Sequence, residues 1–255
     1  MKFLTQAAAV NLDKQLMSVP GFSLDQLMEL AGLSVACAVA KVFPDTAARV
    51  LALAGPGNNG GDALVAARHL FHFGFTNVSV VYPKPSEGPL FRGLVATLQQ
   101  LNIPVTSRVE AADMNGADLV LDGVFGFSFN SRGPIRPPFD HVMKLLRETQ
   151  VPIAAIDIPS GWDVEAGDIG VGVKQPALLI SLTAPKLCAA AYKGRHFLGG
   201  RFLPPALAKD YDLVGLPAYP GTEQAVDVTG WEPGRHSDKS SEDAEVSGKR
   251  GRSEL

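Results

Sequence analysis

The chain contains 255 residues, of which 46% are hydrophobic and 19% charged, and its formal net charge is −3. This composition can bury a sizeable core, which excludes a chain that is disordered throughout, and it provides no basic surface for a nucleic acid backbone. No apolar run is long enough to span a membrane, and the first residues resemble neither a secretory signal nor a transit peptide. We therefore expect a cytoplasmic protein without nucleic acid or membrane partners, or an organellar one if a targeting segment is missing from this sequence.

The first strong helical signal begins at Ser23. Gln26 follows three residues later, which is the spacing of a capping box, and apolar residues then recur at helical spacing until Pro44. This pattern predicts a long helix with a wide apolar face.

Beyond this helix, short apolar runs alternate with helical patterns. The runs predict strands over residues 49–54, 78–82, 103–106, 119–122, 153–157 and 178–183, with helices near 63–73, 89–101 and 139–148. Nearly continuous apolar strands separated by helices indicate a mostly parallel sheet with helices on both faces. The predicted class is α/β, Rossmann-like and doubly wound.

The composition changes after Ala225, where polar and charged residues dominate. Such a segment cannot bury enough surface to offset the entropy of ordering it. We expect one domain over residues 1–226 and a disordered polar tail or linker over residues 227–255.

A glycine-rich stretch lies between the first predicted strand and the next helix. It contains the G-x-G-x-x-G spacing of dinucleotide-binding loops as Gly55, Gly57 and Gly60. Two features disfavour an ordinary nicotinamide dehydrogenase. The next strand ends in residues 82–84 without an acid for a ribose, and the Asp62 carboxylate would compete with a pyrophosphate for the start of the helix.

Polar residues within this stretch have two interpretations each. Asn58 and Asn59 could present amide groups to a ligand, or could satisfy the left-handed turn conformation that asparagine tolerates. Asp62 could belong to a site or could cap the helix.

Two aspartates end apolar strands at the edge where ligands bind in parallel sheets. Asp122 and Asp157 are costly to bury there unless they are paired or bound to a cation. The Ser160 hydroxyl could join Asp122 and Asn59 around a cation of low charge, or could belong to an ordinary turn. Lys186 could be a solvated cation or a charge partner of this site.

Other reactive residue types show no site-like spacing. His69 and His72 lie one helical turn apart without a third metal ligand, which favours a surface pair over a zinc site. Cys37 and Cys188 lack metal or redox spacing, and we expect buried free thiols.

In their order along the chain, these motifs resemble the YjeF N-terminal domain, the NAD(P)H-hydrate epimerases. The resemblance runs from about residue 3 to residue 225. It rests on QLMELAG (26–32), GPGNNGGDALVAARHL (55–70), YPK (82–84), DGVFGFSF (122–129), IDIPSGWDVE (156–165), LISLTAPK (179–186) and GGRFLPPAL (199–207).

The resemblance implies a metabolite-repair isomerase. Such enzymes interconvert the R and S forms of the hydrated cofactors NADHX and NADPHX, so that a separate S-specific dehydratase can restore the cofactor, and they are commonly homodimers. The resemblance places the nucleotide substrate against Asn58, Asn59, Gly60, Gly61, Asp62, Gly126, Phe127, Ser128, Phe129, Asn130, Ser131, Arg132 and Asp157. It places one K⁺ ion per subunit at Asn59, Asp122 and Ser160.

Epimerisation at a hydroxyl-bearing carbon next to nitrogen needs a group that gives and takes a proton. We assign this role to Asp157 as a hypothesis, with Lys186 as a second candidate that tunes it. The alternatives are an NAD(P)-dependent oxidoreductase and a non-catalytic nucleotide-binding or interaction module on the same fold.

Overall fold

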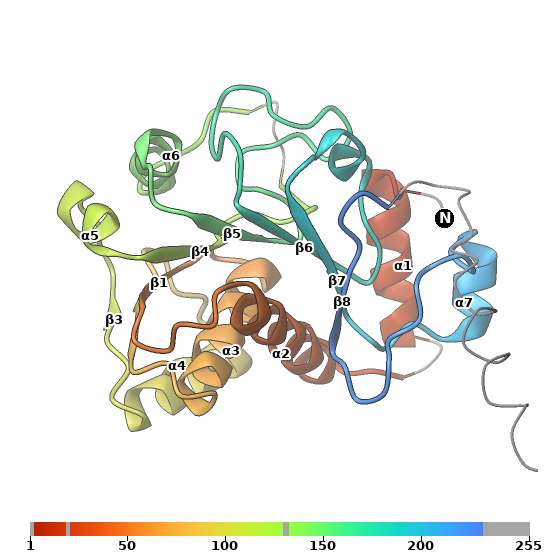
Figure 1. Cartoon of the computed structure of the whole chain (residues 1–255), viewed down its shortest axis with the longest axis horizontal. Coiled ribbons are helices and arrows are strands. Elements are labelled where there is room, and N and C mark those ends of the chain that lie inside the picture. Colours follow the sequence, from red (N-terminus) through yellow and green to blue (C-terminus); the bar gives the residue numbers. More distant parts are fainter. Residues whose placement is uncertain (1–2, 19–20, 130–132, 232–255) are drawn as a thin grey trace, which may run out of the picture.

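The structure, a computed structural model, describes residues 3–18, 21–129 and 133–231. In these ranges eight strands form one sheet in the order β3-β2-β1-β4-β5-β6-β7-β8, and all neighbours are parallel except the final pair, β7 and β8 (Figure 1). The strands are β1 (Arg49–Ala54), β2 (Asn77–Val81), β3 (Val105–Thr106), β4 (Leu119–Gly123), β5 (Ile153–Ile156), β6 (Leu178–Leu182), β7 (Arg195–Gly199) and β8 (Ala225–Asp227).

The strand order changes direction at β1, which has β2 on one side and β4 on the other. In the β1–β4 pair, Leu53 lies opposite Asp122 and Ala54 opposite Gly123. Loops leave in opposite directions from such a switch point, which opens a crevice beyond the carboxyl ends of the strands. The fold therefore places its natural ligand crevice beside Asp122.

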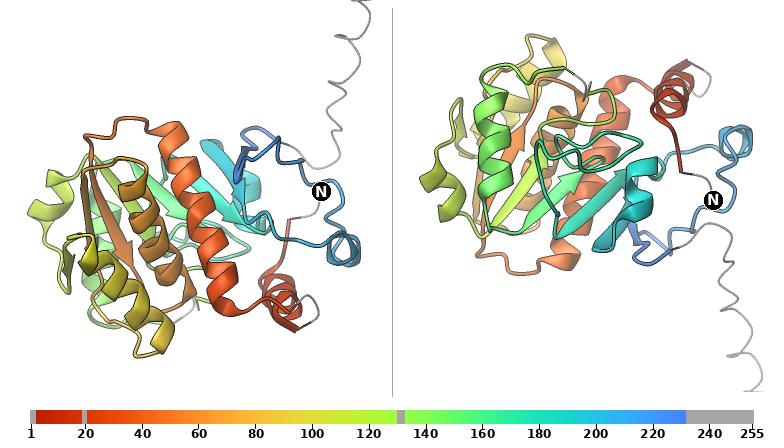
Figure 2. Two further views of the ribbon diagram at one scale, coloured as in Figure 1. Left: turned by 90° about the horizontal axis from the view of Figure 1, so that it is seen from below. Right: turned by 90° about the horizontal axis from the view of Figure 1, so that it is seen from above.

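Helices cover both faces of the sheet, as the doubly wound prediction requires. Helices α2, α3 and α4 pack on one face with the alternate residues of β1 and β2, whereas α5 and α6 pack on the other (Figures 1 and 2). The helices are α1 (Gln6–Ser18), α2 (Leu24–Val42), α3 (Asn58–His72), α4 (Pro89–Gln100), α5 (Ala111–Gly116), α6 (Phe139–Glu148), α7 (Pro205–Asp210) and the 3₁₀ helix η1 (Leu187–Ala191). Within the described ranges, no helix combines the length and apolar character needed to cross a bilayer.

The capping box predicted at the start of α2 is confirmed. The Gln26 backbone N–H donates to Ser23 Oγ at 3.2 Å, and the Ser23 N–H donates to Gln26 Oε1 at 2.9 Å. These two bonds satisfy donors that would otherwise remain free at the helix start. They fix where α2 begins, and residues of its first turns then line the crevice.

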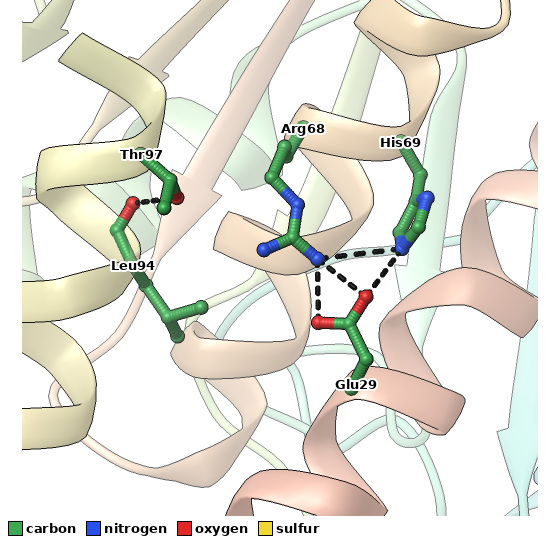
Figure 3. A network of polar contacts seen from close by, with 5 residues as sticks. All are labelled: Glu29, Arg68, His69, Leu94 and Thr97. Atoms are coloured by element: carbon green, nitrogen blue, oxygen red, sulfur yellow. Dashed lines mark hydrogen bonds and ion pairs between the residues drawn. The ribbon is translucent and has the colours of Figure 1, made fainter. Parts of the chain in front are cut away.

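Helices α2 and α3 are joined by close backbone contact and by a polar network on their outer side. A Cβ at Gly32 would lie 2.5 Å from Val65 Cβ, so only glycine allows this approach. On the outer side, the Glu29 carboxylate of α2 accepts from Arg68 and contacts His69 Nε2 at 2.7 Å, both on α3 (Figure 3). His69 is therefore a half-buried partner of Glu29 rather than a member of a surface histidine pair.

The end of the described chain closes against its beginning. β8 reaches Asp227, the Val228 N–H donates to His196 O at 2.8 Å, and the Trp231 ring meets Phe3 edge-on with centroids 6.4 Å apart. The part of the expected tail beyond residue 231 lies outside the described residues.

Both cysteines are free, as expected, but only one is buried. Cys188 is 2% exposed and burial raises the pKa of its thiol to about 12, whereas Cys37 is partly exposed. The expectation of two buried thiols was therefore wrong for Cys37.

Candidate functional site

A cavity of about 570 Å³ lies beyond the carboxyl ends of the central strands. Its size is that of a typical small-ligand pocket. The walls combine loop residues that follow β1, β4, β5 and β6 with one side of α1 and the first turns of α2. Of the residues expected at the site from sequence, the cavity is lined by Asn58, Asn59, Asp62, Gly126, Phe127, Ser128, Phe129, Asp157 and Lys186.

Asp157 and Lys186 form a buried ion pair in this cavity, with each side chain 4% exposed. The Lys186 ammonium donates to Asp157 Oδ1 and to Leu182 O, the latter at 2.8 Å. The Leu182 backbone N–H also donates to Asp157 Oδ1, at 3.3 Å. Lys186 is therefore a charge partner of the site and not a solvated surface cation.

The backbone turns sharply at the two strand ends that carry this pair. Asp157 directly follows β5 with φ 64°, and Thr183 directly follows β6 with φ 65°. Residues other than glycine rarely adopt this left-handed backbone conformation, because it costs of order 1–3 kcal/mol. It persists only where surrounding contacts enforce it. Here the enforcing contacts are hydrogen bonds from Asp157 N–H to Ile180 O at 2.7 Å and from Thr183 N–H to Gly199 O at 3.0 Å.

Asp122 and Ser160 are fully buried and hydrogen-bonded to each other, and neither lines the cavity. The Ser160 hydroxyl donates to Asp122 Oδ1 at 2.5 Å, and its backbone N–H donates to Oδ2 at 2.8 Å. Ser160 Oγ in turn accepts from the Phe125 N–H at 2.8 Å. Burial raises the pKa of Asp122 to about 6, even though these hydrogen bonds favour its charged form. Ser160 lies in a turn, as one interpretation expected, and its side chain also belongs to a buried network with Asp122.

Asn59 completes this group of expected ligands. Its side chain is buried, and its Nδ2 atom has no hydrogen-bond partner in the described part of the chain. Gly126 lies against the amide, since a Cβ there would be 3.2 Å from Asn59 Cγ. Buried amides are normally satisfied, so an orphaned one in the cavity wall points to a missing ligand or to a rotated amide that presents its oxygen.

The first turns of α3 carry the expected substrate residues. α3 begins at Asn58 with Gly57 as its cap, so the glycine-rich stretch becomes helical earlier than expected. Asn58 and Asn59 are helical and lack positive φ, and Asp62 makes no capping bond. The turn and capping interpretations of these three residues were therefore wrong.

Asp62 faces the cavity with only 8% of its surface exposed. Within the described ranges, its carboxyl group has no hydrogen bond or ion pair. Burial raises the pKa of Asp62 well above its usual value, and the nearby carboxylates of Asp157 and Asp13 raise it further against an opposing effect of Lys186. Asp62 and Asp157 therefore differ in their surroundings, because Asp157 is paired with Lys186 whereas Asp62 has no ion pair among the described residues.

Gly55 and Gly60 of the G-x-G-x-x-G spacing serve close packing, whereas a Cβ at Gly57 would meet nothing within 4 Å. A Cβ at Gly55 would lie 1.7 Å from Val124 O, and one at Gly60 would lie 1.9 Å from Gly55 O. A Cβ at Gly61 would meet Met28 Sδ at 2.3 Å. Neither Gly60 nor Gly61 lines the cavity, so their contact with a substrate remains a prediction.

An aromatic loop forms another wall. The Phe125 and Phe129 rings stack with centroids 4.2 Å apart, and Lys186 Nζ lies 5.4 Å from the centre of the Phe127 ring. Asn130, Ser131 and Arg132, which the resemblance adds to this loop, lie outside the described residues.

Sequence reasoning missed the contribution of α1. The Gln6 side chain donates to Phe127 O at 2.7 Å and to Phe129 O at 3.3 Å, and Asp13 lines the cavity. Two signals were available: Thr5 precedes the helix and its Oγ1 accepts from the Ala8 N–H at 3.2 Å, and the buried residues Ala9, Leu12 and Leu16 recur at helical spacing. Asp13 is the one acidic residue of this helix.

Comparison with known proteins places the chain in a family. A family model described as "YjeF-related protein N-terminus" matches residues 24–188. The chain belongs to the YjeF N-terminal family. The solved structure of yeast YNL200c is similar, with a TM-score of 0.82 and 39% sequence identity over 89% of this chain and 100% of the yeast chain. The family model starts at residue 24, so α1 lies outside the matched segment.

A curated relative from Arabidopsis thaliana is also similar. It is named "Pyridoxine/pyridoxamine 5'-phosphate oxidase 1, chloroplastic" and is 49% identical over 241 residues, which cover 89% of this chain. The match covers 45% of the relative, so this chain spans about half of that protein's length.

Proposed function

We propose that this protein is an NAD(P)H-hydrate epimerase that interconverts the R and S forms of NADHX and NADPHX. The observation that carries the proposal is the buried Asp157–Lys186 pair, which lines a cavity of about 570 Å³ in a member of the YjeF N-terminal family. The product would supply an S-specific dehydratase.

The substrate chemistry explains why such a pair is needed. The epimerised carbon carries a hydroxyl group and adjoins the ring nitrogen, so it inverts by loss and return of the hydroxyl or by ring opening and closure. Either route moves a proton at that hydroxyl, and a positioned acid or base contributes about 10² to 10⁴ in rate. Asp157 is the proton-transfer group in this proposal. Lys186 holds its carboxyl in place through a buried ion pair.

The remaining cavity residues position the nucleotide. Asn58, Asn59 and Asp62 from α3 and residues 126–129 from the aromatic loop line the cavity together. Their amide, carboxyl and backbone groups are suited to the hydroxyls and carboxamide of the substrate.

We also propose that one K⁺ ion binds at Asn59, Asp122 and Ser160. The donor set contains one carboxylate with neutral oxygens, which suits a monovalent cation, and the orphaned Asn59 amide lies in the same region. Among the described residues, no cluster of three or more His, Cys, Asp or Glu side chains offers a transition-metal site. The bound ion would neutralise Asp122 and order the loop that reaches Phe125.

An oxidase is the second candidate, because the Arabidopsis relative carries that name. The match leaves more than half of that relative uncovered, so the named activity need not reside in the shared segment. In this chain, close packing accounts for Gly55 and Gly60 of the dinucleotide-like spacing. A non-catalytic module is the third candidate, but such a module has no need for a buried Asp157–Lys186 pair.

The test is equilibration of purified hydrate epimers by the full chain. We expect catalysed equilibration by the wild-type protein, and a loss of about 10² or more in rate for Asp157→Asn with nucleotide binding retained. Asp25→Asn, an exposed acid on α2 outside the cavity, is the matched control and should react like wild type. Normal turnover by Asp157→Asn would remove this residue from the mechanism, and oxidation of pyridoxine 5'-phosphate without epimerisation would favour the oxidase.

Three further properties are proposals that need separate measurements. A homodimer is expected and is tested by sedimentation velocity of the purified chain. Coupling to a dehydratase is tested by cofactor recovery in a two-enzyme assay. The compartment is tested with a fluorescent fusion, for which the cytoplasm is the expectation and the chloroplastic relative supplies the organellar alternative.

A further inference from the structure

Helix α1 is fixed against the candidate site, although it lies outside the segment that the family model matches. Leu4, just before it, forms a parallel bridge with Lys186, with hydrogen bonds from Leu4 N–H to Pro185 O at 2.9 Å and from Leu187 N–H to Leu4 O at 3.0 Å. Gln6 holds the aromatic loop by two further bonds. Figures 1 and 2 show α1 beside α7, and the two helices share a cluster of buried apolar residues.

One stripe of α1 forms a wall of the cavity. Ala9, Val10, Asp13, Lys14 and Met17 line it at helical spacing. The lone acid of this stripe is Asp13, a half-buried residue whose carboxyl group has no hydrogen bond or ion pair in the described part of the chain.

The charged groups around Asp13 come from several elements. Asp13 interacts electrostatically with Lys186 and Asp157 at the strand ends and with Asp62 on α3. Lys14 is its exposed neighbour on α1. Burial raises the pKa of Asp13, which allows this carboxyl to carry a proton more readily than an exposed one. Two carboxyl groups therefore line one cavity. Asp13 comes from α1 and has no ion pair among the described residues, whereas Asp157 comes from the sheet edge and is paired with Lys186.

Inversion of a carbon by loss and return of its hydroxyl requires proton transfer on both faces of the ring. When water leaves from one face, the carbon becomes planar and shares the positive charge with the ring nitrogen. Return of water to the same face restores the starting epimer. Inversion occurs only when water returns to the opposite face and gives up a proton there.

We propose that Asp13 is the proton-transfer group on the face of the substrate ring opposite to that served by Asp157. The proposal rests on the epimerase function. In one direction, the Asp157 carboxylic acid donates a proton to the departing hydroxyl, the carbon–oxygen bond breaks, and the ring nitrogen supplies the electron pair. Water then attacks from the α1 side, forms the new carbon–oxygen bond and transfers its extra proton to the Asp13 carboxylate. The proton then returns from Asp13 to Asp157 through solvent, which restores the starting state of the protein, so that no net proton or water is consumed. The reverse direction exchanges the two roles.

The experiment follows inversion and oxygen exchange separately in H₂¹⁸O, with each epimer as starting material. The wild-type protein should invert both epimers and incorporate ¹⁸O into both. Asp13→Asn should lose inversion by about 10² or more, yet still exchange ¹⁸O with retention in the one epimer whose hydroxyl faces Asp157. Asp13→Glu should restore part of the inversion. Asn11→Ala, an exposed change on the same helix outside the cavity, should behave like wild type, and circular dichroism verifies that each variant is folded.

The possible results separate this inference from the proposed function. The role of Asp13 would be overturned if Asp13→Asn inverted the substrate at the wild-type rate, or if it lost inversion and ¹⁸O exchange equally in both epimers. If the wild-type protein inverted the substrate without incorporating ¹⁸O, the water-loss route would be overturned, and with it the assignment of Asp13 and Asp157 to opposite faces of the ring. Absence of any catalysed inversion by the wild-type protein would instead refute the proposed function.

Discussion

His196 should make the stability of this protein sensitive to acid. The residue lies on β7 with 7% of its surface exposed, its Nε2 atom is 2.9 Å from Ser181 Oγ, and its ring meets Tyr192 edge-on. Burial lowers its pKa from 6.5 to about 4, and the charge of Asp227 offsets this effect in part. The native state therefore keeps His196 neutral at pH values where the unfolded chain protonates it.

The size of the effect follows from this difference in pKa. Because the unfolded state binds more protons between pH 6.5 and 4, the contribution of His196 to stability is complete above pH 6.5 and is lost as the pH falls towards 4. A lowering from 6.5 to about 4 corresponds to about 3 kcal/mol in total, of which about 2 kcal/mol is lost by pH 5. Asp122 acts in the opposite sense, since its raised pKa adds stability at low pH. Total stability against pH therefore cannot isolate His196.

A comparison of variants isolates the effect. Urea unfolding of wild type and His196→Gln at about pH 7.5 and pH 5 should show that the wild type loses about 2 kcal/mol more than the variant between the two conditions. Ser181→Ala, which removes the hydroxyl partner but not the ring, should be less stable by about 1 kcal/mol at both pH values and keep the wild-type pH dependence. An NMR titration measures the pKa of His196 directly. Parallel pH dependence in wild type and His196→Gln, or a pKa near 6.5, would refute the reasoning.

Two further outcomes are expected. Gly32→Ala should lower the free energy of unfolding in urea by about 1–3 kcal/mol, because the added Cβ would overlap Val65. The control, Gly93→Ala, lies on the exposed side of α4 with open space around it and should raise the free energy of unfolding by about 0.5–1 kcal/mol. Equal effects of the two changes would contradict the packing argument. The Tm of the wild-type protein should be higher in K⁺ than in tetramethylammonium at equal ionic strength. Ser160→Ala should abolish this difference in Tm, whereas the control Ser181→Ala should retain it. A K⁺ effect on Tm that survives in Ser160→Ala would place the ion elsewhere.

The central layers could be predicted because their signals are local. All six predicted strands correspond to β1–β6, since each is an apolar run bounded by turn residues, and the predicted helices correspond to α2, α3, α4 and α6. The site residues at the strand ends followed from the same reasoning, because parallel strands bring their carboxyl ends to one edge. Burial of acids at these ends was expected, and the structure places Asp122, Asp157 and Ser160 in the interior.

The elements that sequence reasoning missed depend on distant contacts. β7 is as long as β6, but it begins with Arg195 and His196 and so is not a continuous apolar run; its position is set by parallel pairing with β6. β8 pairs with β7 in the antiparallel direction at the sheet edge. α1 has a weak local pattern and is held by Leu4 and Gln6, whose partners lie more than 100 residues away. No local rule identifies such contacts. Asp13 therefore escaped notice as a member of the site.

The left-handed turn at Thr183 limits how this protein can be engineered. A β-branched residue is the least suited to φ 65°, so replacement by glycine or asparagine relieves backbone strain at a position that lines the cavity. A library of variants screened for thermal stability would enrich such replacements. A library screened for turnover would instead keep Thr183, because its side chain forms part of the cavity wall. Thr183 is thus a position where the two selections diverge, and stabilised variants need an activity screen at this residue.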